Sequence, residues 1–244
     1  AGGTMTNGAG SDIVADFRMA LDLVKRYPVM AAPPLIAMAV VFVLTLLFFG
    51  GAATMVAVGG LAGRGAGLAG AVVGGAFLFL VFIAVSMLVN LISSAVVVVM
   101  AKDALGSREP SLGDAFAAVM ARLSDVVVAS VLFAVIVGIA SLFLVIPGII
   151  AGFFLMFTLP AVLLDNVGAI DGIKRSATLV KNNLGPVLGL AIGAIVAAVI
   201  MAIASMILGV VPVIGQLASM LLAGAFFAYL TVVAVRVYQT LPRR

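Results

Sequence analysis

The chain has 244 residues, of which 65% are hydrophobic and 9% are charged, and its formal net charge is +4. So few polar residues cannot cover a water-soluble surface, whereas apolar runs of about 20 residues are what a bilayer core requires. Cysteine and histidine are absent, which excludes disulfides, thiolate or imidazole metal sites and the commonest general base. We therefore expect an integral membrane protein with no metal and no cofactor.

The first charged stretch, residues 11–26, precedes the first apolar run. Its apolar residues recur at the spacing of one helix face, and its charged residues lie off that face. The pattern predicts a short amphipathic helix, which we call an elbow helix. Residues 1–10 before it are expected to be a flexible tail, and residues 11–244 a single membrane domain. The apolar face consists of Ile13, Phe17, Ala20, Leu21 and Val24.

Two spans are expected next, at about 33–58 and 71–101. The Gly-rich stretch 59–70 around Arg64 is expected to be the loop that connects them. The second span has about 30 residues and rises about 45 Å, against a hydrocarbon core of about 30 Å. We expect it to tilt or to project into the cytoplasm.

A second elbow helix is predicted in the charged stretch 111–125. Ser111 and Asp114 have the spacing of a capping box at its start. The charge-free interval 126–164 that follows is too long for one span. Pro147-Gly148 near its middle predicts a tight hairpin, because proline interrupts a helix and glycine permits a reversed backbone. The expected spans are 126–146 and 149–164.

The third charged stretch, 165–182, predicts the third elbow helix, and the interval after it divides at residues 212–215 into spans of about 184–209 and 213–236. The first of these spans carries small residues at strict four-residue spacing, which lets another helix approach closely. A partner helix in the same chain is favoured over one in another chain. The small residues are Gly185, Gly189, Gly193 and Ala197.

The positive charges predict the orientation of the spans. With six spans, twelve of the thirteen Lys and Arg residues lie on one side of the membrane, and only Arg64 lies on the other. The positive-inside rule then places both termini in the cytoplasm, whereas five spans would divide the basic clusters between the two faces. The sequence thus predicts an all-α integral protein of the cytoplasmic (inner) membrane. Its six transmembrane helices form three hairpins, each preceded by a cytoplasmic amphipathic elbow helix.

Polar residues inside the spans are few. No Asp, Glu, Lys or Arg lies inside a predicted span, whereas an ion-coupled transporter usually keeps one. Ser86, Asn90 and Ser94 share one face of the second span. Hydrogen bonding to other helices is the favoured interpretation of this face, over a permeation path.

Residues that would carry catalysis are scarce at the cytoplasmic side as well. Asp165 and Asp171, with Lys174 and Arg175, are the components of a phosphate site, and a membrane enzyme would need such a carboxylate cluster. Without histidine, cysteine or a paired-carboxylate geometry, a solvated helix surface is the favoured interpretation. We therefore predict no catalytic residue and a protein that is not an enzyme.

The order of motifs between residues 147 and 190 resembles a known family. The motifs are Pro147-Gly148-Ile149, Pro160, Asp165, Ile173-Lys-Arg175-Ser176, Leu179-Val-Lys181-Asn182 and Val187-Leu-Gly189-Leu. They are similar to the membrane domain of the glycerophosphoryl diester phosphodiesterase membrane-domain family and related uncharacterised six-span proteins of bacteria and archaea, over roughly 105–235. The chain lacks the tryptophan that relatives often place after the Arg-Ser pair. The resemblance implies six spans and cytoplasmic termini, but no activity, because the phosphodiesterase of that family is a separate soluble domain.

These observations favour a non-enzymatic accessory or scaffold protein whose basic elbow helices engage anionic lipid headgroups, a protein partner or a second copy of the chain. The basic residues stand in small clusters beside the spans, which argues for lipid and against nucleic acid, and each contributes about 1 kcal/mol toward an anionic leaflet. The alternative is a small-molecule or lipid transporter with its path along the Ser86, Asn90 and Ser94 face. The residues expected at headgroups are Lys174, Arg175, Ser176 and Lys181, followed by Lys25, Arg26 and Arg122.

Overall fold

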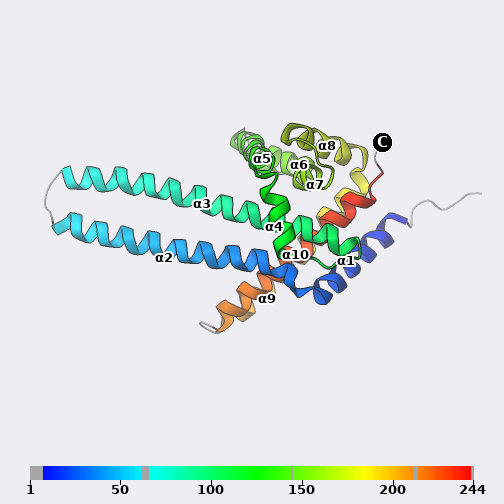
Figure 1. Ribbon diagram of the computed structural model, residues 1–244, viewed down its shortest axis with the longest axis horizontal. Helices are drawn as coiled ribbons and strands as arrows, with labels where there is room; N and C mark the ends of the chain where they lie inside the picture. Colours follow the sequence, from blue (N-terminus) through cyan, green and yellow to red (C-terminus); the bar gives the residue numbers. More distant parts are fainter. Residues whose placement is uncertain (1–7, 62–65, 144, 211–213, 243–244) are drawn as a thin grey trace, which may run out of the picture.

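The computed structural model describes residues 8–61, 66–143, 145–210 and 214–242, and every regular element in these segments is helical (Figure 1). Six of the helical segments are long and apolar enough to cross a membrane. The expected all-helical class with six candidate spans is therefore confirmed. The segments are Pro28–Gly51, Gly74–Leu105, Leu123–Leu142, Val145–Leu164, Leu184–Leu208 and Ile214–Thr240.

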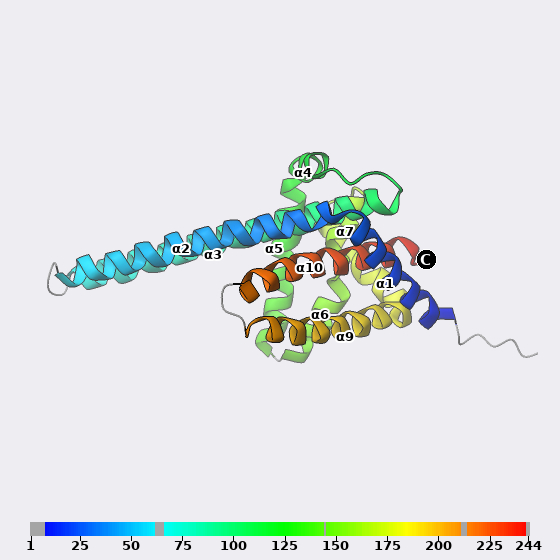
Figure 2. The same cartoon turned by 90° about the horizontal axis from the view of Figure 1, so that it is seen from below.

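The N-terminal part consists of one short helix and a long helix pair. Helix α1 (Gly8–Arg26) leads through the short 3-10 helix η1 (Pro28–Ala31) into α2 (Ala32–Leu61), and α3 (Ala66–Leu105) returns beside α2. With 40 residues, α3 rises about 60 Å, roughly twice the thickness of a hydrocarbon core. Figures 1 and 2 both show the α2–α3 pair projecting well beyond all the other helices.

The connection between α2 and α3 is shorter than the sequence suggested. Residues 59–70 were expected to form a loop, but α2 continues to Leu61 and α3 begins at Ala66. Arg64 itself lies outside the described residues. Glycine weakens a helix in water, yet a segment in lipid must satisfy its own backbone hydrogen bonds, which favours the helix even through a Gly-rich stretch.

The middle part begins with α4 (Leu112–Met120), which Ser111 caps by accepting a hydrogen bond from the Asp114 backbone N–H at 3.3 Å. Helix α5 (Leu123–Phe143) follows, then α6 (Val145–Leu155) and α7 (Thr158–Leu164). The expected span 149–164 is thus two helices with a break at residues 156–157. The Ser111 half of the predicted capping box is therefore confirmed.

Pro147 and Gly148 do not form the turn between α5 and α6. Helix α6 begins at Val145, so Pro147 occupies its first turn, where a missing N–H costs no helical hydrogen bond. Gly148 faces α5, and a Cβ at that position would lie 1.9 Å from the Ser141 Oγ. Glycine is needed there for the close approach of the two helices, not for a reversed backbone.

The C-terminal part contains α8 (Ala169–Asn182), α9 (Leu184–Leu208) and α10 (Ile214–Thr240). Helices α9 and α10 lie side by side. Of the predicted break at residues 212–215, the first two residues lie outside the described residues and the last two begin α10 at Ile214. In both views α1 lies at the end of the molecule where the C-terminus lies, opposite the tip of the α2–α3 pair (Figures 1 and 2).

The hydrophobic core lies where the long helices meet, and we call it the hub. It is formed by the C-terminal halves of α3 and α10, the start of α5, and the short helices α4, α7 and α8. Figure 2 shows α5 and α6 running across the direction of α2 and α3, so the helix pairs diverge from the hub instead of forming the single bundle that the chain length suggested. The side chains that are fully buried in the hub include Val96, Met100, Val126, Phe157, Val162, Val180 and Tyr238.

Outside the hub the long helices expose large apolar side chains. Leu47 in α2 and Phe77 in α3 are 67% and 65% exposed. Phe48, Phe79 and Phe82 stack on one another between the same two helices. Such a surface is unfavourable in water but suits contact with lipid acyl chains.

Candidate functional site

Three arginines join neighbouring helices through ion pairs and hydrogen bonds, which we call ties, and Arg122 is the first of these arginines. Its Nη1 donates to the carbonyl oxygen of Val162 at 2.6 Å and to Oδ1 of Asn166 at 3.1 Å. Its Nη2 donates to Oδ2 of Asp125 at 3.0 Å and to the carbonyl oxygen of Val167 at 2.9 Å. Asn166 lies in the left-handed region with φ 55°. Arg122 therefore joins the start of α5 to the turn between α7 and α8, and its guanidinium is largely occupied by the protein.

Arg175 is the second tie. Its Nε lies 2.9 Å from Oδ2 of Asp165, whose side chain is only 8% exposed. The hydroxyl of Tyr238 donates a short hydrogen bond to the same carboxylate oxygen. The Tyr238 ring packs against Phe157 with 5.6 Å between ring centroids. Asp165 thus links α7, α8 and α10, and this carboxylate serves the hub as a nearly buried anion with its countercharge beside it.

Arg236 is the third tie, and it fastens α1 to α10. Its Nε lies 3.0 Å from Oδ1 of Asp16. Nearby, the small-residue face of α9 receives two side chains of α1. A Cβ at Gly189 would lie 2.2 Å from Cδ1 of Ile13, and a Cβ at Gly193 would lie 2.7 Å from the ring of Phe17.

The partner that the structure gives to the α9 glycines is therefore an elbow helix of the same chain, and not another span. A Cβ at Gly185 would meet nothing within 4 Å, and Ala197 lines a groove described below.

Ser176, expected at a lipid headgroup, is fully buried. Its hydroxyl donates to the carbonyl oxygen of Phe154 at 2.9 Å and accepts from the backbone N–H of Phe157 at 3.1 Å. These are the backbone groups on either side of the break between α6 and α7. Ser176 stands on the inward face of α8 with Gly172, so it satisfies the broken helix and has no access to lipid. The interpretation of this residue as a headgroup contact is corrected accordingly.

The outward face of α8 combines basic and apolar side chains. Ile170, Lys174, Thr178 and Lys181 follow one another at helical spacing, and all four are exposed. Ile170 is 59% exposed although it is apolar. Within the described part of the chain, neither lysine forms an ion pair. The inward face of α8 is formed instead by Ala169, Gly172, Ser176, Leu179 and Val180.

Helix α1 presents a similar outward row. Val14, Arg18, Leu21 and Lys25 lie along it, and all four are exposed, Val14 to 53%. Among the described residues Lys25 has no ion-pair partner. Arg26 is also exposed, and its guanidinium carbon lies 5.5 Å from the ring centroid of Tyr27. We call these two rows, on α1 and α8, the basic rows.

On the polar face of α3, Asn90 and Ser94 bond within their own helix, whereas the Ser86 hydroxyl is buried and has no hydrogen-bond partner among the described residues. Nδ2 of Asn90 donates to the carbonyl oxygen of Ser86 at 2.8 Å, and Oγ of Ser94 donates to the carbonyl oxygen of Asn90 at 2.8 Å. These donors were expected to bond to other helices, but side chains of this kind readily bond one turn back along their own helix. They line none of the three grooves described in this structure.

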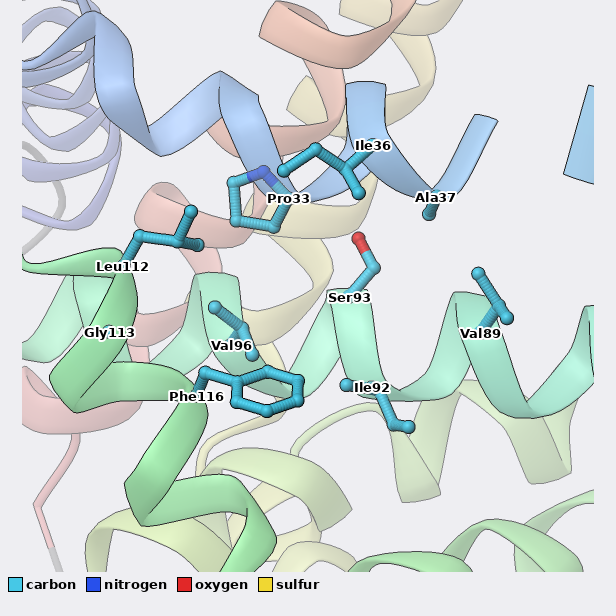
Figure 3. A pocket seen from close by; sticks show the side chains of 10 residues that line it. All are labelled: Pro33, Ile36, Ala37, Val89, Ile92, Ser93, Val96, Leu112, Gly113 and Phe116. Carbon is cyan, nitrogen blue, oxygen red and sulfur yellow. The ribbon is translucent and has the colours of Figure 1, made fainter. Parts of the chain in front are cut away.

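One of these grooves lies under α4, between α2 and α3, and has a volume of about 330 Å³. Figure 3 shows the Ser93 hydroxyl pointing toward α2 in this groove, among otherwise apolar side chains. A second groove of about 370 Å³ contains the Asp16–Arg236 ion pair. In the described residues, no group of three or more Asp or Glu side chains is placed to hold a metal ion.

The ties to Asp16, Asp165 and Tyr238 were not predicted. Asp165 stood out in the sequence only as a component of a phosphate site, and nothing distinguished Asp16 from the other acidic residues of α1. Arg236 and Tyr238 come from α10, far along the chain from Asp16 and Asp165, and Arg175 lies in the helix after Asp165, so no spacing within one helix indicates these contacts.

Comparison with known proteins gives one match. Residues 112–241, just over half of the chain, match the sequence profile of a family described as a domain of unknown function, DUF7847. The matched region runs from α4 to the end of α10 and leaves out α1, α2 and α3. No curated protein and no solved structure matches the chain. The resemblance to the glycerophosphodiester phosphodiesterase membrane domains stays a prediction.

Proposed function

We propose that this chain, which belongs to the DUF7847 family, is a non-enzymatic membrane scaffold whose basic rows bind anionic lipid headgroups. In this proposal the α2–α3, α5–α6 and α9–α10 pairs are transmembrane hairpins. The elbow helices α1, α4 and α8 lie at the cytoplasmic face and lead into these hairpins, and both termini are cytoplasmic. The membrane is the cytoplasmic membrane.

The observation that carries the proposal is a division between three arginines that are paired within the chain and the exposed lysines of the basic rows. Arg122, Arg175 and Arg236 each form an ion pair at 2.9–3.0 Å with a carboxylate of the chain. The planar guanidinium suits such fixed, multiply bonded contacts. The lysines of the basic rows are exposed and have no ion pair among the described residues, so their charge is available to a ligand outside the chain.

The residues beside these lysines favour lipid as that ligand. Ile170 on α8 and Val14 on α1 are exposed apolar side chains in the same rows as the basic ones. A helix that presents both kinds of side chain outward suits the boundary between headgroups and acyl chains, where each lysine contributes about 1 kcal/mol toward an anionic leaflet.

Two observations favour a scaffold over the alternative of a transporter. The donors of Asn90 and Ser94 are engaged by the α3 backbone, and the burial is concentrated in the hub. A permeation path would need polar groups directed at a water-filled passage between the spans.

The test is lipid co-purification of the full chain measured by native mass spectrometry. Replacing Lys174 and Lys181 together by glutamine is expected to lower the number of anionic phospholipids that are retained. The matched control replaces both by arginine, which keeps the charge, and should retain wild-type levels. Equal retention by the glutamine and wild-type proteins would overturn the proposal.

A further inference from the structure

The largest of the grooves described in this structure lies away from the α8 row, where α1 ends. It has a volume of about 520 Å³ and lies between α1, η1 and the α9–α10 pair. Its walls include Leu21 and Val24 of α1, Ala197 and Ala204 of α9, and Phe226 of α10. Lys25 is the one charged side chain among the residues that line it.

The groove exists because small residues continue along α9 after the contact with α1 has ended. The Phe17 ring fills the space over Gly193. One turn farther along each helix, Ala197 faces Leu21, which is 44% exposed and does not close the gap. Ala204 continues the same face of α9, and Ala225 of α10 adds another small side chain. The shape of the groove is therefore built into the sequence of α9 and α10.

An apolar groove on spans that lie in a bilayer is filled by hydrocarbon, because an empty groove would lose dispersion contacts on every wall. Lys25, which is one of the lining residues, carries a positive charge, and Arg26 is its neighbour in sequence. An anionic phospholipid carries both complementary parts in one molecule, a long acyl chain and a negatively charged headgroup phosphate.

We propose that this groove holds one acyl chain of an anionic phospholipid whose phosphate is bound by Lys25. The inference rests on the proposed function in that it takes lipid as the ligand, but it concerns one defined site with a shape requirement. The α8 row, in contrast, lines none of the grooves described in this structure. The two proposals can therefore fail separately.

The decisive variant is Ala204→Phe, which fills the groove without changing any charge. Native mass spectrometry of the full chain, titrated with phosphatidylglycerol in mild detergent, is expected to show one tightly held lipid in the wild type. In the variant we expect its affinity to fall about tenfold. The control Ala198→Phe places the same ring on the exposed side of α9, outside the groove, and should keep that lipid.

Charge and headgroup are tested by Lys25→Gln. The affinity for phosphatidylglycerol is expected to fall about fivefold, and the preference over zwitterionic phosphatidylcholine should disappear. If the wild type bound both lipids equally, the assignment of Lys25 to a headgroup phosphate would be overturned. The Lys174 and Lys181 double variant should keep the single tight lipid, so its loss there would assign that lipid to α8.

A second measurement does not depend on the folding of any variant. Phosphatidylglycerol with a photoreactive group in its acyl chain is added to the wild-type chain in nanodiscs and crosslinked, and the labelled peptides are mapped. Labelling concentrated in residues 197–204 and 222–229 supports the groove. Labelling spread evenly over the exposed faces of all the spans overturns it.

Discussion

Asp16 and Arg236 lie 220 residues apart in the chain, and their side chains meet at 3.0 Å. This ion pair joins the first elbow helix to the last span. Together with the contacts of Ile13 and Phe17 at the glycines of α9, it fixes α1 on the α9–α10 pair. The direction in which α1 presents Lys25 follows from this attachment.

The ion pair can be tested by a double-mutant cycle with Asp16→Asn and Arg236→Gln. Each single change leaves a partly buried charge without its partner, and we expect each to lower the free energy of unfolding by about 2 kcal/mol. The double variant should lose clearly less than the sum of the two. The measurement is unfolding in mixed micelles by denaturing detergent. Strictly additive losses would show that the pair does not act as a unit.

The seat of α1 on α9 can be tested by Gly193→Val. A Cβ at this position would lie 2.7 Å from the Phe17 ring, so we expect α1 to be displaced and trypsin to cut faster after Lys25 and Arg26. Adding Phe17→Ala to the same chain makes room for the valine and should restore part of the protection. Gly185→Val is the matched control, since a Cβ there meets nothing within 4 Å. Equal cleavage of both valine variants would contradict the assigned contact.

At position 122, lysine is expected to be less stabilising than arginine although both are basic. Arg122→Gln removes a cation with four acceptors around it and is expected to cost about 3 kcal/mol of stability. Arg122→Lys keeps the charge but not the planar fork, so it should recover only part of that loss. Thermal unfolding of the detergent-solubilised proteins gives the order of their stabilities. A lysine variant as stable as the wild type would mean that charge alone is required.

Replacing Ser176 should lower stability without changing lipid binding. Ser176→Ala removes the two hydrogen bonds at the break between α6 and α7, which should lower stability by about 1–3 kcal/mol. Because the side chain is fully buried, the number of retained anionic lipids should not change at a temperature where the variant stays folded. If the variant lost bound lipid without losing stability, the assignment of Ser176 to the interior would be contradicted. Thr178→Ala, on the outward face of α8, is the control for the stability measurement.

The helices were predictable because each depends on neighbouring residues. Long apolar runs predict spans, and the 3–4-residue recurrence of Ile13, Phe17 and Ala20 predicts α1. The two errors in the connections have different causes. Gly59–Gly60 and Pro147-Gly148 would mark turns in water, but both lie in helices, because lipid favours internal backbone hydrogen bonding and the first turn of a helix accepts proline.

The surface was less predictable than the helices. Sequence spacing grouped Lys174, Arg175 and Ser176 together as headgroup contacts. In the structure Lys174 is exposed to solvent, Arg175 pairs with Asp165, and Ser176 is buried. Adjacent residues of a helix point about 100° apart, so a cluster in sequence is not a cluster in space. Which direction faces the hub depends on α5, α6 and α7, which pack against α8, and no pattern within α8 specifies that.

The central position of α10 has a consequence for the order in which the protein is made. Helix α10 contacts α1, α2, α3 and α9, but a ribosome produces it after all of them. In the proposed topology the earlier helices enter the bilayer one pair at a time, since insertion requires only their own apolar length. The hub cannot close until residues 228–238 have emerged. Assembly is therefore divided into early insertion and late packing. Asp16 has no access to Arg236 until translation is nearly complete.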